Sequence, residues 1–535
     1  MESHKLRNPI PKPASLSNSE KKAKEKEDLT GSEKLVANVI FSWTGHIVFI
    51  IAGFILPRMI DQRLGQDVLG IWDFAWSLVN YFGLVGAGIT SSVNRYVAKY
   101  RISGDIPALN GMVSSAAFIM NISGLLVLGL SIIVSLLMPL LFGNRLGENI
   151  NEAQWVVFFL GAGIGVEIAF GAFNGVLTGC HRWGLQNIIN SSWHAITIIG
   201  MIVALLLNSG LRILALIYLI GIVMTCITRM ISAYLVCEHL RVHPSFIKWK
   251  TIKKAFTFGV KTLIPSISKL LFNQTTSVLI VLYLGTPMLA LYTRPRSLLL
   301  HANTLVKKMG LVLIPTASSL QSEGNMEKIR TLLIKSVRYS FYMVLPIVLT
   351  LIVFGGTIMR FWMGPDYDDS LVPGILAAGF LMIMAQTPIW VILVGLNAHG
   401  RAGIAELIAS LISAGLIFFG LKFLKLELPW IAIAVTAPLT IMNLTYLPLL
   451  ICRRIGLDVK RYFLSVTIGP VIHVLPFALS LIIARLIFKT QPFVGLLWGG
   501  TLGTAALAVL YYRYVLPDRI KMRLLRYWRI KGSII

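Results

Sequence analysis

Long apolar stretches separated by short polar breaks run along most of the chain. A helix that crosses a bilayer needs about 20 consecutive, mostly apolar residues, and each stretch is long enough. The pattern therefore predicts an all-α polytopic membrane protein with about fourteen transmembrane helices. The expected spans are residues 35–60, 69–90, 107–141, 152–178, 185–208, 211–237, 255–285, 287–315, 331–361, 370–397, 402–424, 428–452, 464–488 and 493–515.

The composition agrees with a membrane environment. The 535 residues are 56% hydrophobic and 13% charged, whereas a soluble domain has about a quarter charged residues. The 49 Lys and Arg residues outnumber the 23 Asp and Glu residues, for a net charge of +26. Most of these cations lie in short breaks between apolar stretches, where they set membrane orientation and do not indicate nucleic-acid binding. The four cysteines have no metal-binding spacing, so no metal or cofactor is expected.

The breaks between the predicted spans alternate in charge. Cations concentrate in every second break and in the basic C-terminal end, while the other breaks hold few cations and several acids, among them Asp61 and Asp67. The excess of cations on the cytoplasmic side of membrane proteins then predicts cytoplasmic termini in a multi-pass protein of the cytoplasmic (inner) membrane. Residues 1–34, rich in Lys, Glu, Ser and Pro, are expected to form a disordered basic cytoplasmic tail.

Two parts of the sequence repeat each other at an offset of about 220 residues. RLGQDVLGIW at 63–72 matches YLGTPMLALY at 283–292, and Gly104 then matches Gly324. The offset predicts two parallel repeats of about six helices each, which form two lobes. The expected parts are the tail at 1–34, an N-lobe at 35–237, a C-lobe at 238–452, two further helices at 453–516 and the basic cytoplasmic end at 517–535.

Several motifs resemble a known transporter family. Residues 55–105 contain a helix, the turn LGQDVLG, a second helix, then RYVAKY and a Gly-Asp step. Together with NGVLTGCHRWGLQNII at 174–189 and VLIVLYLGTPMLALY at 278–292, this pattern is similar to that of polysaccharide flippases, over about residues 35–450. These are the O-antigen and teichoic-acid exporters of the multidrug/oligosaccharidyl-lipid/polysaccharide (MOP) superfamily. The resemblance implies two six-helix lobes, alternating access, and a cationic cavity for the diphosphate and sugars of a polyprenyl-linked oligosaccharide.

Basic residues inside the predicted spans are the first candidates for substrate contact, because a charge in hydrocarbon is costly unless it faces a cavity or a partner. Arg294, His301 and Lys308 recur every seven residues and so share one face of a helix. The resemblance implies that this helix lines a groove between the lobes, where Arg and Lys suit a diphosphate. The expected substrate-binding residues are His46, Lys261, Lys269, Arg294, His301 and Lys308.

Simpler interpretations stay open for some of these residues. Lys261 and Lys308 lie near the predicted inner surface, where a long side chain extends to water. His46 also fits a buried neutral histidine with one hydrogen-bond partner. Arg296 and Lys307 lie on other faces of the eighth predicted span and are expected at the membrane interface.

Two acids are the candidates for ion coupling or gating. Glu167 lies in the middle of a span among small residues, where it either forms a structural salt bridge with Arg229 or responds to a proton or sodium ion. Asp73 shares a helix face with Ser77 and Asn80, and either lies at the membrane interface or acts in a gate.

The sequence favours a transporter over an enzyme. The predicted outer loops are about ten residues or shorter, which leaves no room for a roofed site with an acid/base set, and no GxxxxGK[ST] loop is present. The predicted function is a flippase that moves a polyprenyl-diphosphate-linked oligosaccharide to the outer leaflet for cell-surface polysaccharide assembly. Its expected partners are this substrate, membrane lipids and other polysaccharide-assembly proteins. The alternatives are a lipid II flippase and an ion-coupled multidrug exporter of the same superfamily, although a cationic drug calls for acids where bases predominate.

Overall fold

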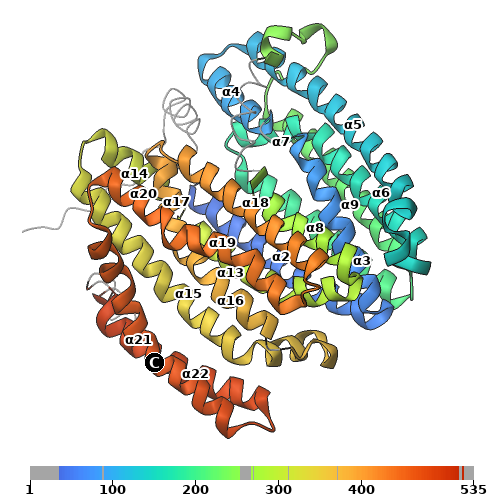
Figure 1. Ribbon diagram of the computed structural model, residues 1–535. Coiled ribbons are helices and arrows are strands. Elements are labelled where there is room, and N and C mark those ends of the chain that lie inside the picture. Colours follow the sequence, from blue (N-terminus) through green and yellow to red (C-terminus); the bar gives the residue numbers. More distant parts are fainter. Residues whose placement is uncertain are drawn as a thin grey trace, which may run out of the picture.

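The described part of the chain is helical throughout (Figure 1). Among these residues, ten helices or joined helices are long and apolar enough to cross a membrane, or eleven if the bent pair Gln66–Leu84 and Ile89–Ser103 is one span. The all-α membrane class is therefore confirmed, whereas the number of about fourteen spans is not. The computed structural model describes residues 35–86, 89–253, 267–268, 270–310, 313–369, 371–516, 518 and 521–522, without the side chains of 35–44, 46 and 309.

The first half of the fold, here called the N-terminal half, consists of α2 to α9. Gly65, with φ 96° and ψ 163°, makes the sharp turn between α2 and α3, a backbone conformation that is essentially restricted to glycine. In this half α2 packs against α8, and α6 packs against both α5 and α9. The elements are α2 (Leu35–Leu64), α3 (Gln66–Val79), η2 (Asn80–Leu84), α4 (Ile89–Ser103), α5 (Ile106–Leu146), η3 (Gly147–Asn149), α6 (Ile150–Ala169), α7 (Gly171–Gly179), α8 (Trp183–Leu206) and α9 (Leu211–Val236).

The second half, here called the C-terminal half, runs from η5 to α20 and follows the short η4 (Pro244–Phe246). Here α15 packs against α16, and α18 packs against α19. The elements are η5 (Leu271–Thr275), α12 (Thr276–Leu284), α13 (Thr286–Gly310), α14 (Leu313–Ser322), α15 (Met326–Met363), η6 (Pro365–Tyr367), α16 (Leu371–Ala385), α17 (Thr387–Gly395), α18 (Gly400–Phe423), α19 (Leu428–Leu444) and α20 (Tyr446–Ile455).

The last helices, α21 (Val459–Ile487) and α22 (Pro492–Leu510), followed by η7 (Tyr511–Val515), lie at one edge of the molecule (Figure 1). They join the fold through α15, against which both helices pack. The Arg338 Nε–H group donates to the carbonyl oxygen of Ser465 at 2.7 Å, and the Tyr342 hydroxyl lies 2.9 Å from His473 Nδ1. In the described part of the chain these helices therefore pack on the C-terminal half.

Local backbone features recur at the offset found in the sequence. Gly65 and Gly285, 220 positions apart, have φ values of 96° and 93°, and Gly104 and Gly324, again 220 apart, have 69° and 68°. The residue after each member of the second pair caps the next helix, with Asp105 accepting from Ala108 N and Asn325 accepting from Lys328 N. The same turns and caps thus occur in both halves, while their division into two independently moving lobes stays a prediction.

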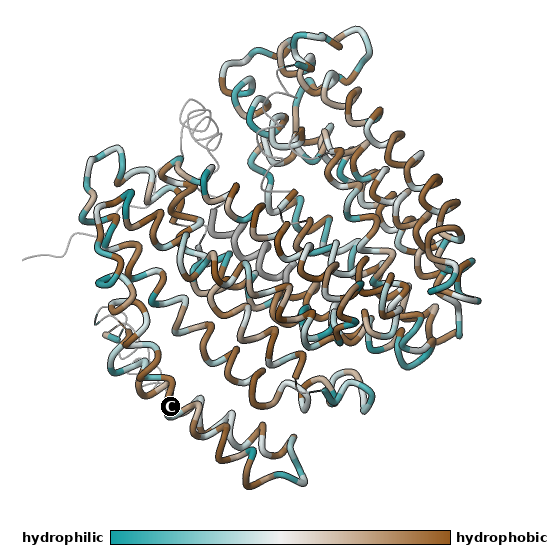
Figure 2. The backbone as a smooth tube through the Cα atoms, viewed as in Figure 1, coloured by the Kyte–Doolittle hydropathy of each residue, from teal (hydrophilic) through white to brown (hydrophobic). Residues whose placement is uncertain are grey.

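The surface of the described part is apolar where helices face outward. Figure 2 shows hydrophobic residues along the outer helices and hydrophilic residues gathered at the loops. Leu125 and Leu140 on α5, for example, are 69% and 81% exposed. Large apolar side chains at this exposure are stable in lipid and costly in water. The protein is therefore a multi-pass membrane protein.

Candidate functional site

The two helices that follow the repeated turns, α3 and α13, bring the two halves into direct contact. The pair packs side by side. A Cβ added to Gly70 of α3 would lie only 2.0 Å from the carbonyl oxygen of Thr286, so the two backbones touch at this point. The contact lies at the end of the fold that carries Gly65 and Gly285, which the sequence assigns to the outside; it is called the predicted outer end below.

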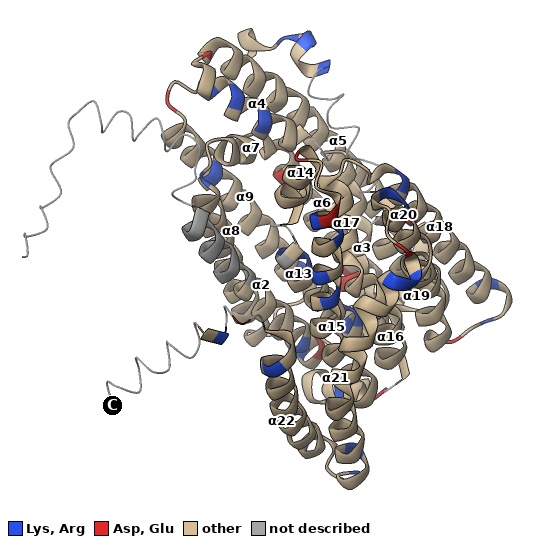
Figure 3. Cartoon of the chain, turned by 90° about the vertical axis from the view of Figure 1, so that its left-hand side faces the viewer, with Lys and Arg blue, Asp and Glu red and all other residues tan. Residues whose placement is uncertain are grey.

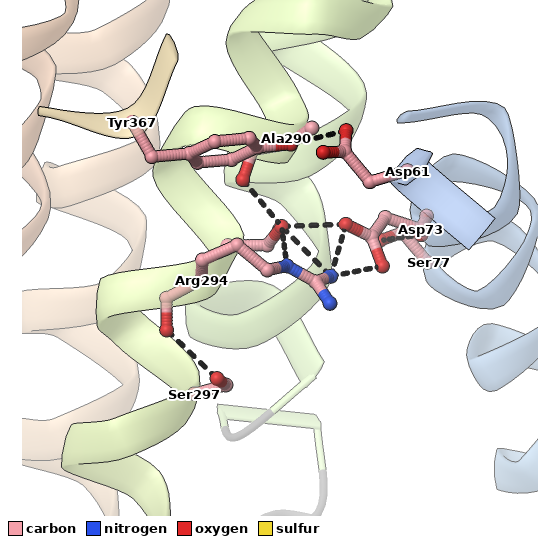
Figure 4. Close-up of polar contacts among 8 residues, drawn as sticks. Asp61, Asp73, Ser77, Ala290, Arg294, Ser297 and Tyr367 are labelled. Carbon is pink, nitrogen blue, oxygen red and sulfur yellow. Dashed lines mark hydrogen bonds and ion pairs between the residues drawn. The ribbon is translucent and has the colours of Figure 1, made fainter. Parts of the chain in front are cut away.

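An ion pair between Asp73 and Arg294 crosses this contact (Figure 4). The Arg294 Nη2–H group donates to both carboxylate oxygens of Asp73, at 2.5 Å to Oδ1. The Thr293 hydroxyl donates to Oδ2 of the same carboxylate at 2.5 Å. The side chains are only 7% and 13% exposed for Arg294 and Asp73. Each charge is therefore removed from water and depends on the other for its stability.

Further polar contacts join the halves around this ion pair. The Tyr367 hydroxyl donates to Asp61 Oδ1 at 2.8 Å, and the Thr286 hydroxyl donates to Asp67 Oδ1 at 3.0 Å. The Trp362 indole N–H donates to the carbonyl oxygen of Phe54 at 2.8 Å. Together these contacts join α2 and α3 to α13, α15 and η6, and we call them the closure network. Its members are Arg58 with the carbonyls of Phe361 and Trp362, Phe54 with Trp362, Asp61 with Tyr367, Asp67 with Thr286, and Asp73 with Thr293 and Arg294.

The predicted substrate-binding residues fall into three groups. Lys261 and Lys269 lie outside the described residues, as does the side chain of His46. Arg294 is buried and engaged with Asp73, so in this conformation it is not open to a ligand. His301 and Lys308 are half-buried on α13. Figure 3 shows Lys and Arg residues in the middle of the molecule around α13 and α15, as well as near α4.

His301 lies where α13 passes α2 of the other half. Its ring stacks on Phe54, with the ring centroids 6.1 Å apart. A Cβ added to Gly53 would lie 3.3 Å from His301 Nε2, so Gly53 leaves space for the imidazole. His301 is about two helical turns from Arg294, and therefore lies further along α13 from the predicted outer end than the ion pair of Arg294 with Asp73.

The expectation that Arg296 lies at the membrane interface is wrong. Arg296 is 7% exposed, and its Nη2–H group donates to Asn273 Oδ1. Its guanidinium carbon lies 5.9 Å from the ring centroids of both Phe272 and Tyr292. Arg296 is thus held by neighbours within the C-terminal half, through contacts with η5 and its own helix, whereas Lys307 is exposed.

Glu167 and Arg229 form the ion pair that the sequence suggested, at 3.4 Å between Oε1 and Nη1. The Arg229 Nε–H group also donates to Asn190 Oδ1 at 2.9 Å. The Arg229 side chain is 9% exposed, but that of Glu167 is 46% exposed. Both line a cavity of about 540 Å³ among α2, α3, α6, α8 and α9 of the N-terminal half. The two residues therefore form a salt bridge while the carboxylate of Glu167 stays accessible from the cavity. Ion coupling by Glu167 stays a prediction.

Comparison with known proteins matches both the sequence and the fold. Residues 185–372 match the family described as polysaccharide biosynthesis protein. A putative O-antigen transporter from Shigella flexneri is 21% identical over 388 residues, which cover 70% of this chain and 87% of that protein. The structure of the lipid II flippase MurJ in an inward closed conformation is similar over 90% of this chain and 100% of that chain, with 14% identity and a TM-score of 0.68. An inward-facing multidrug resistance MATE family transporter of the MOP superfamily is similar over 78% and 99%, with 15% identity and a TM-score of 0.66.

These proteins carry the names of transporters or of a flippase, and none is named as an enzyme. The predicted class of the chain, a transporter and not an enzyme, agrees with them. At 14% and 15% identity the two structures show a common fold, and a common fold does not by itself determine function. The relationship expected from the sequence is confirmed: the chain is a multi-pass membrane protein with the MOP-superfamily fold, similar in sequence to polysaccharide biosynthesis proteins and to an O-antigen transporter.

Proposed function

We propose that the protein is a flippase that moves a polyprenyl-diphosphate-linked oligosaccharide from the cytoplasmic to the outer leaflet of the inner membrane by alternating access. Its N-lobe and C-lobe, residues 35–237 and 238–452, move relative to each other, and both termini are cytoplasmic. The observation that carries the proposal is the arrangement on α13. Arg294 belongs to the closure network, and His301 and Lys308 continue the same helix face away from the predicted outer end. The names of an O-antigen transporter and a lipid II flippase among the similar proteins support this class of cargo.

In this mechanism the cargo enters while the closure network holds the predicted outer ends together. Its diphosphate binds the basic residues of α13, His301 and Lys308, joined by Lys261 and Lys269, while the prenyl tail stays in the bilayer. Lys and protonated His supply point charges for phosphate oxygens, and Arg supplies a bidentate fork.

The ion pair gives a physical link between cargo binding and opening. A diphosphate that advances along α13 competes with Asp73 for Arg294. Exchange of one anion for another leaves the arginine paired at every stage, whereas the Asp73 carboxylate loses its partner and is stabilised again only when it is exposed to water. Once Arg294 has left Asp73, the strongest contact of the closure network is lost and the outer end opens. Cargo of this charge therefore promotes its own release on the outer side.

Export of glycan by cells tests the proposal. The variant His301→Ala/Lys308→Ala removes two cations that are not part of the closure network, and Lys307→Ala removes an exposed cation of the same helix as the matched control. We expect surface glycan to fall about tenfold or more in the double variant, because two charge-assisted contacts are lost, and to stay near normal in the control. Unimpaired export by the double variant at normal protein levels would refute the assigned role.

A lipid II flippase is the alternative that the MurJ structure supports. The two functions share the mechanism above and differ in the cargo. Expression in a strain depleted of its lipid II flippase separates them. Rescue of peptidoglycan synthesis would establish the alternative, and no rescue with intact glycan export would leave the proposed cargo.

A further inference from the structure

The cavity in the N-terminal half has a wall of aromatic side chains. Trp72 and Trp76 of α3 meet edge to face with ring centroids 6.2 Å apart, and Trp76 meets Tyr218 in the same way at 4.9 Å. On another side, Phe49 and His194 are stacked with centroids 3.9 Å apart. All five residues line the cavity. Both tryptophans therefore contribute to the same aromatic wall of the cavity.

The same cavity also has a cluster of polar side chains that combines a carboxylate, a guanidinium and an amide. Arg229 donates hydrogen bonds to both Glu167 and Asn190, and all three residues line the cavity. Only Oε1 of Glu167 contacts Arg229, which leaves the carboxylate, 46% exposed, able to accept further hydrogen bonds. A carboxylate, a guanidinium and an amide offer acceptors and donors side by side, which is the pattern that neighbouring hydroxyl groups on one ring can satisfy in pairs.

The charge of the cavity decides between classes of ligand. Glu167 and Arg229 are its charged lining residues among those described, and they neutralise each other at 3.4 Å. A diphosphate would meet the carboxylate, and a cation would have to compete with Arg229 for it. A prenyl chain would leave the polar group without water or partners, which is costly. A neutral ligand with a polar rim and apolar C–H faces fits both the aromatic wall and the polar cluster of the cavity.

We propose that this cavity is a sugar-binding subsite, in which Trp72, Trp76 and Tyr218 stack on the C–H faces of pyranose rings while Glu167, Arg229 and Asn190 bind their hydroxyl groups. Its volume of about 540 Å³ lies within the range of about 300–1,000 Å³ for small-molecule sites. The inference rests on the proposed function and names the part of the protein that recognises the oligosaccharide.

The position of the cavity suits this role. Gly53 of α2 lines it, and a Cβ on that glycine would lie 3.3 Å from Nε2 of His301. The imidazole proposed to bind diphosphate and the cavity proposed to bind sugar thus meet at Gly53, which has no side chain to separate them. A diphosphate held on α13 can carry its first sugar towards the tryptophans.

Saturation-transfer NMR on the full-length purified protein tests the subsite with a panel of methyl glycosides of common hexoses and N-acetylhexosamines. We expect at least one glycoside to receive saturation. Trp76→Leu and Glu167→Gln should each weaken its binding about tenfold or more. Trp76→Phe, which keeps an aromatic face, should retain most of it. Trp430→Leu is the matched control, since Trp430 is 57% exposed and is not one of the residues that line the cavity. Thermal unfolding of each variant identifies any that fails to fold. If Glu167→Gln does not fold, the comparison of Trp76→Phe with Trp76→Leu still tests the subsite.

Three results would overturn the subsite: no glycoside binds, the bound glycoside is insensitive to Trp76, or tetraphenylphosphonium binds in a Trp76-dependent way while the glycosides do not. The last result would assign the cavity to cations. Glycan export by cells that carry His301→Ala/Lys308→Ala is measured independently of glycoside binding to the cavity. Unimpaired export together with Trp76-dependent sugar binding would refute the proposed diphosphate path alone, and impaired export with Trp76-independent sugar binding would refute the subsite alone.

Discussion

Removal of the Asp73 carboxylate should open the contact between α3 and α13. In Asp73→Asn, Arg294 keeps the neighbouring Thr293 hydroxyl at 3.1 Å but loses its only ion-pair partner among the described residues. A buried ion pair that loses one partner typically costs about 3–5 kcal/mol, because the remaining charge stays out of water. When the halves separate, Arg294 regains hydration and this cost disappears. The closed arrangement should therefore become less populated by roughly a hundredfold to several thousandfold at most.

Labelling of a buried cysteine measures this shift. Ala290 on α13 is fully buried, one turn from both Thr286 and Arg294 (Figure 4), so Ala290→Cys in a background without the four native cysteines reports on opening. Its reaction with a maleimide should be slow in the otherwise unchanged protein and much faster with Asp73→Asn. Asp73→Asn combined with Arg294→Gln removes both charges and should restore slow labelling in large part.

A second ion pair supplies the control. Arg360 and Asp368 also contact each other at 3.0 Å, but their side chains are 57% and 45% exposed. Such a pair contributes about 1 kcal/mol or less, so Asp368→Asn should change the labelling rate less than about fivefold. Equal labelling rates for the unchanged protein, Asp73→Asn and the double variant would refute the role of this ion pair in closure.

Three further substitutions test other parts of the account. Gly70→Ala places a Cβ 2.0 Å from the Thr286 carbonyl oxygen and should speed labelling at the same cysteine, whereas Gly83→Ala, with open space around it, should not. Gly285→Ala puts a side chain at φ 93° and ψ 175° and should lower the unfolding free energy by about 1–3 kcal/mol; Gly143→Ala in a regular helix is its control for thermal unfolding. Arg296→Gln should lower thermal stability by about 1–3 kcal/mol through lost buried contacts without reducing binding of a short polyprenyl diphosphate, and a selective loss of that binding would contradict its structural role.

The helices were predictable because lipid imposes a single solution on the backbone. Without water, a spanning segment must satisfy its own N–H and C=O groups, so apolar length is nearly sufficient to find it. Breaks inside a span leave no such signal. The predicted segment 152–178 is two helices, separated at Phe170, and 370–397 is likewise divided at Gln386. Hydropathy averages over these positions because the residues on both sides are equally apolar.

The sequence identified Asp73 and Arg294 as candidate functional residues but did not predict that they form an ion pair. Both residues were identified as unusual charges in spans, and their separation of 221 positions is close to the repeat offset. Thr293, which also contacts Asp73, is 220 positions away. Equivalent elements that face each other across a twofold axis place equivalent residues in contact. The repeat therefore pointed to this pair, but only if α3 and α13 were assumed to touch, and packing between distant helices cannot be read from periodicity.

The cavity of the N-terminal half could not be predicted from the sequence either, because it also depends on packing between distant helices. Its walls come from five helices, and Trp72, Trp76 and Tyr218 are ordinary residues for apolar spans. Only Glu167 and Arg229 stood out, because charge in a span is rare. Their contact with Asn190 and their exposure to a cavity depend on how α6, α8 and α9 pack together.

Binding of farnesyl diphosphate to the purified protein, measured by calorimetry, tests whether the basic face of α13 beyond Arg294 receives a lipid-linked diphosphate. We expect binding of farnesyl diphosphate but not of farnesol, a loss of affinity of about tenfold or more in His301→Ala/Lys308→Ala, and normal affinity in Lys307→Ala. Equal affinity in the double variant and the unchanged protein, or equal binding of the uncharged alcohol, would contradict it.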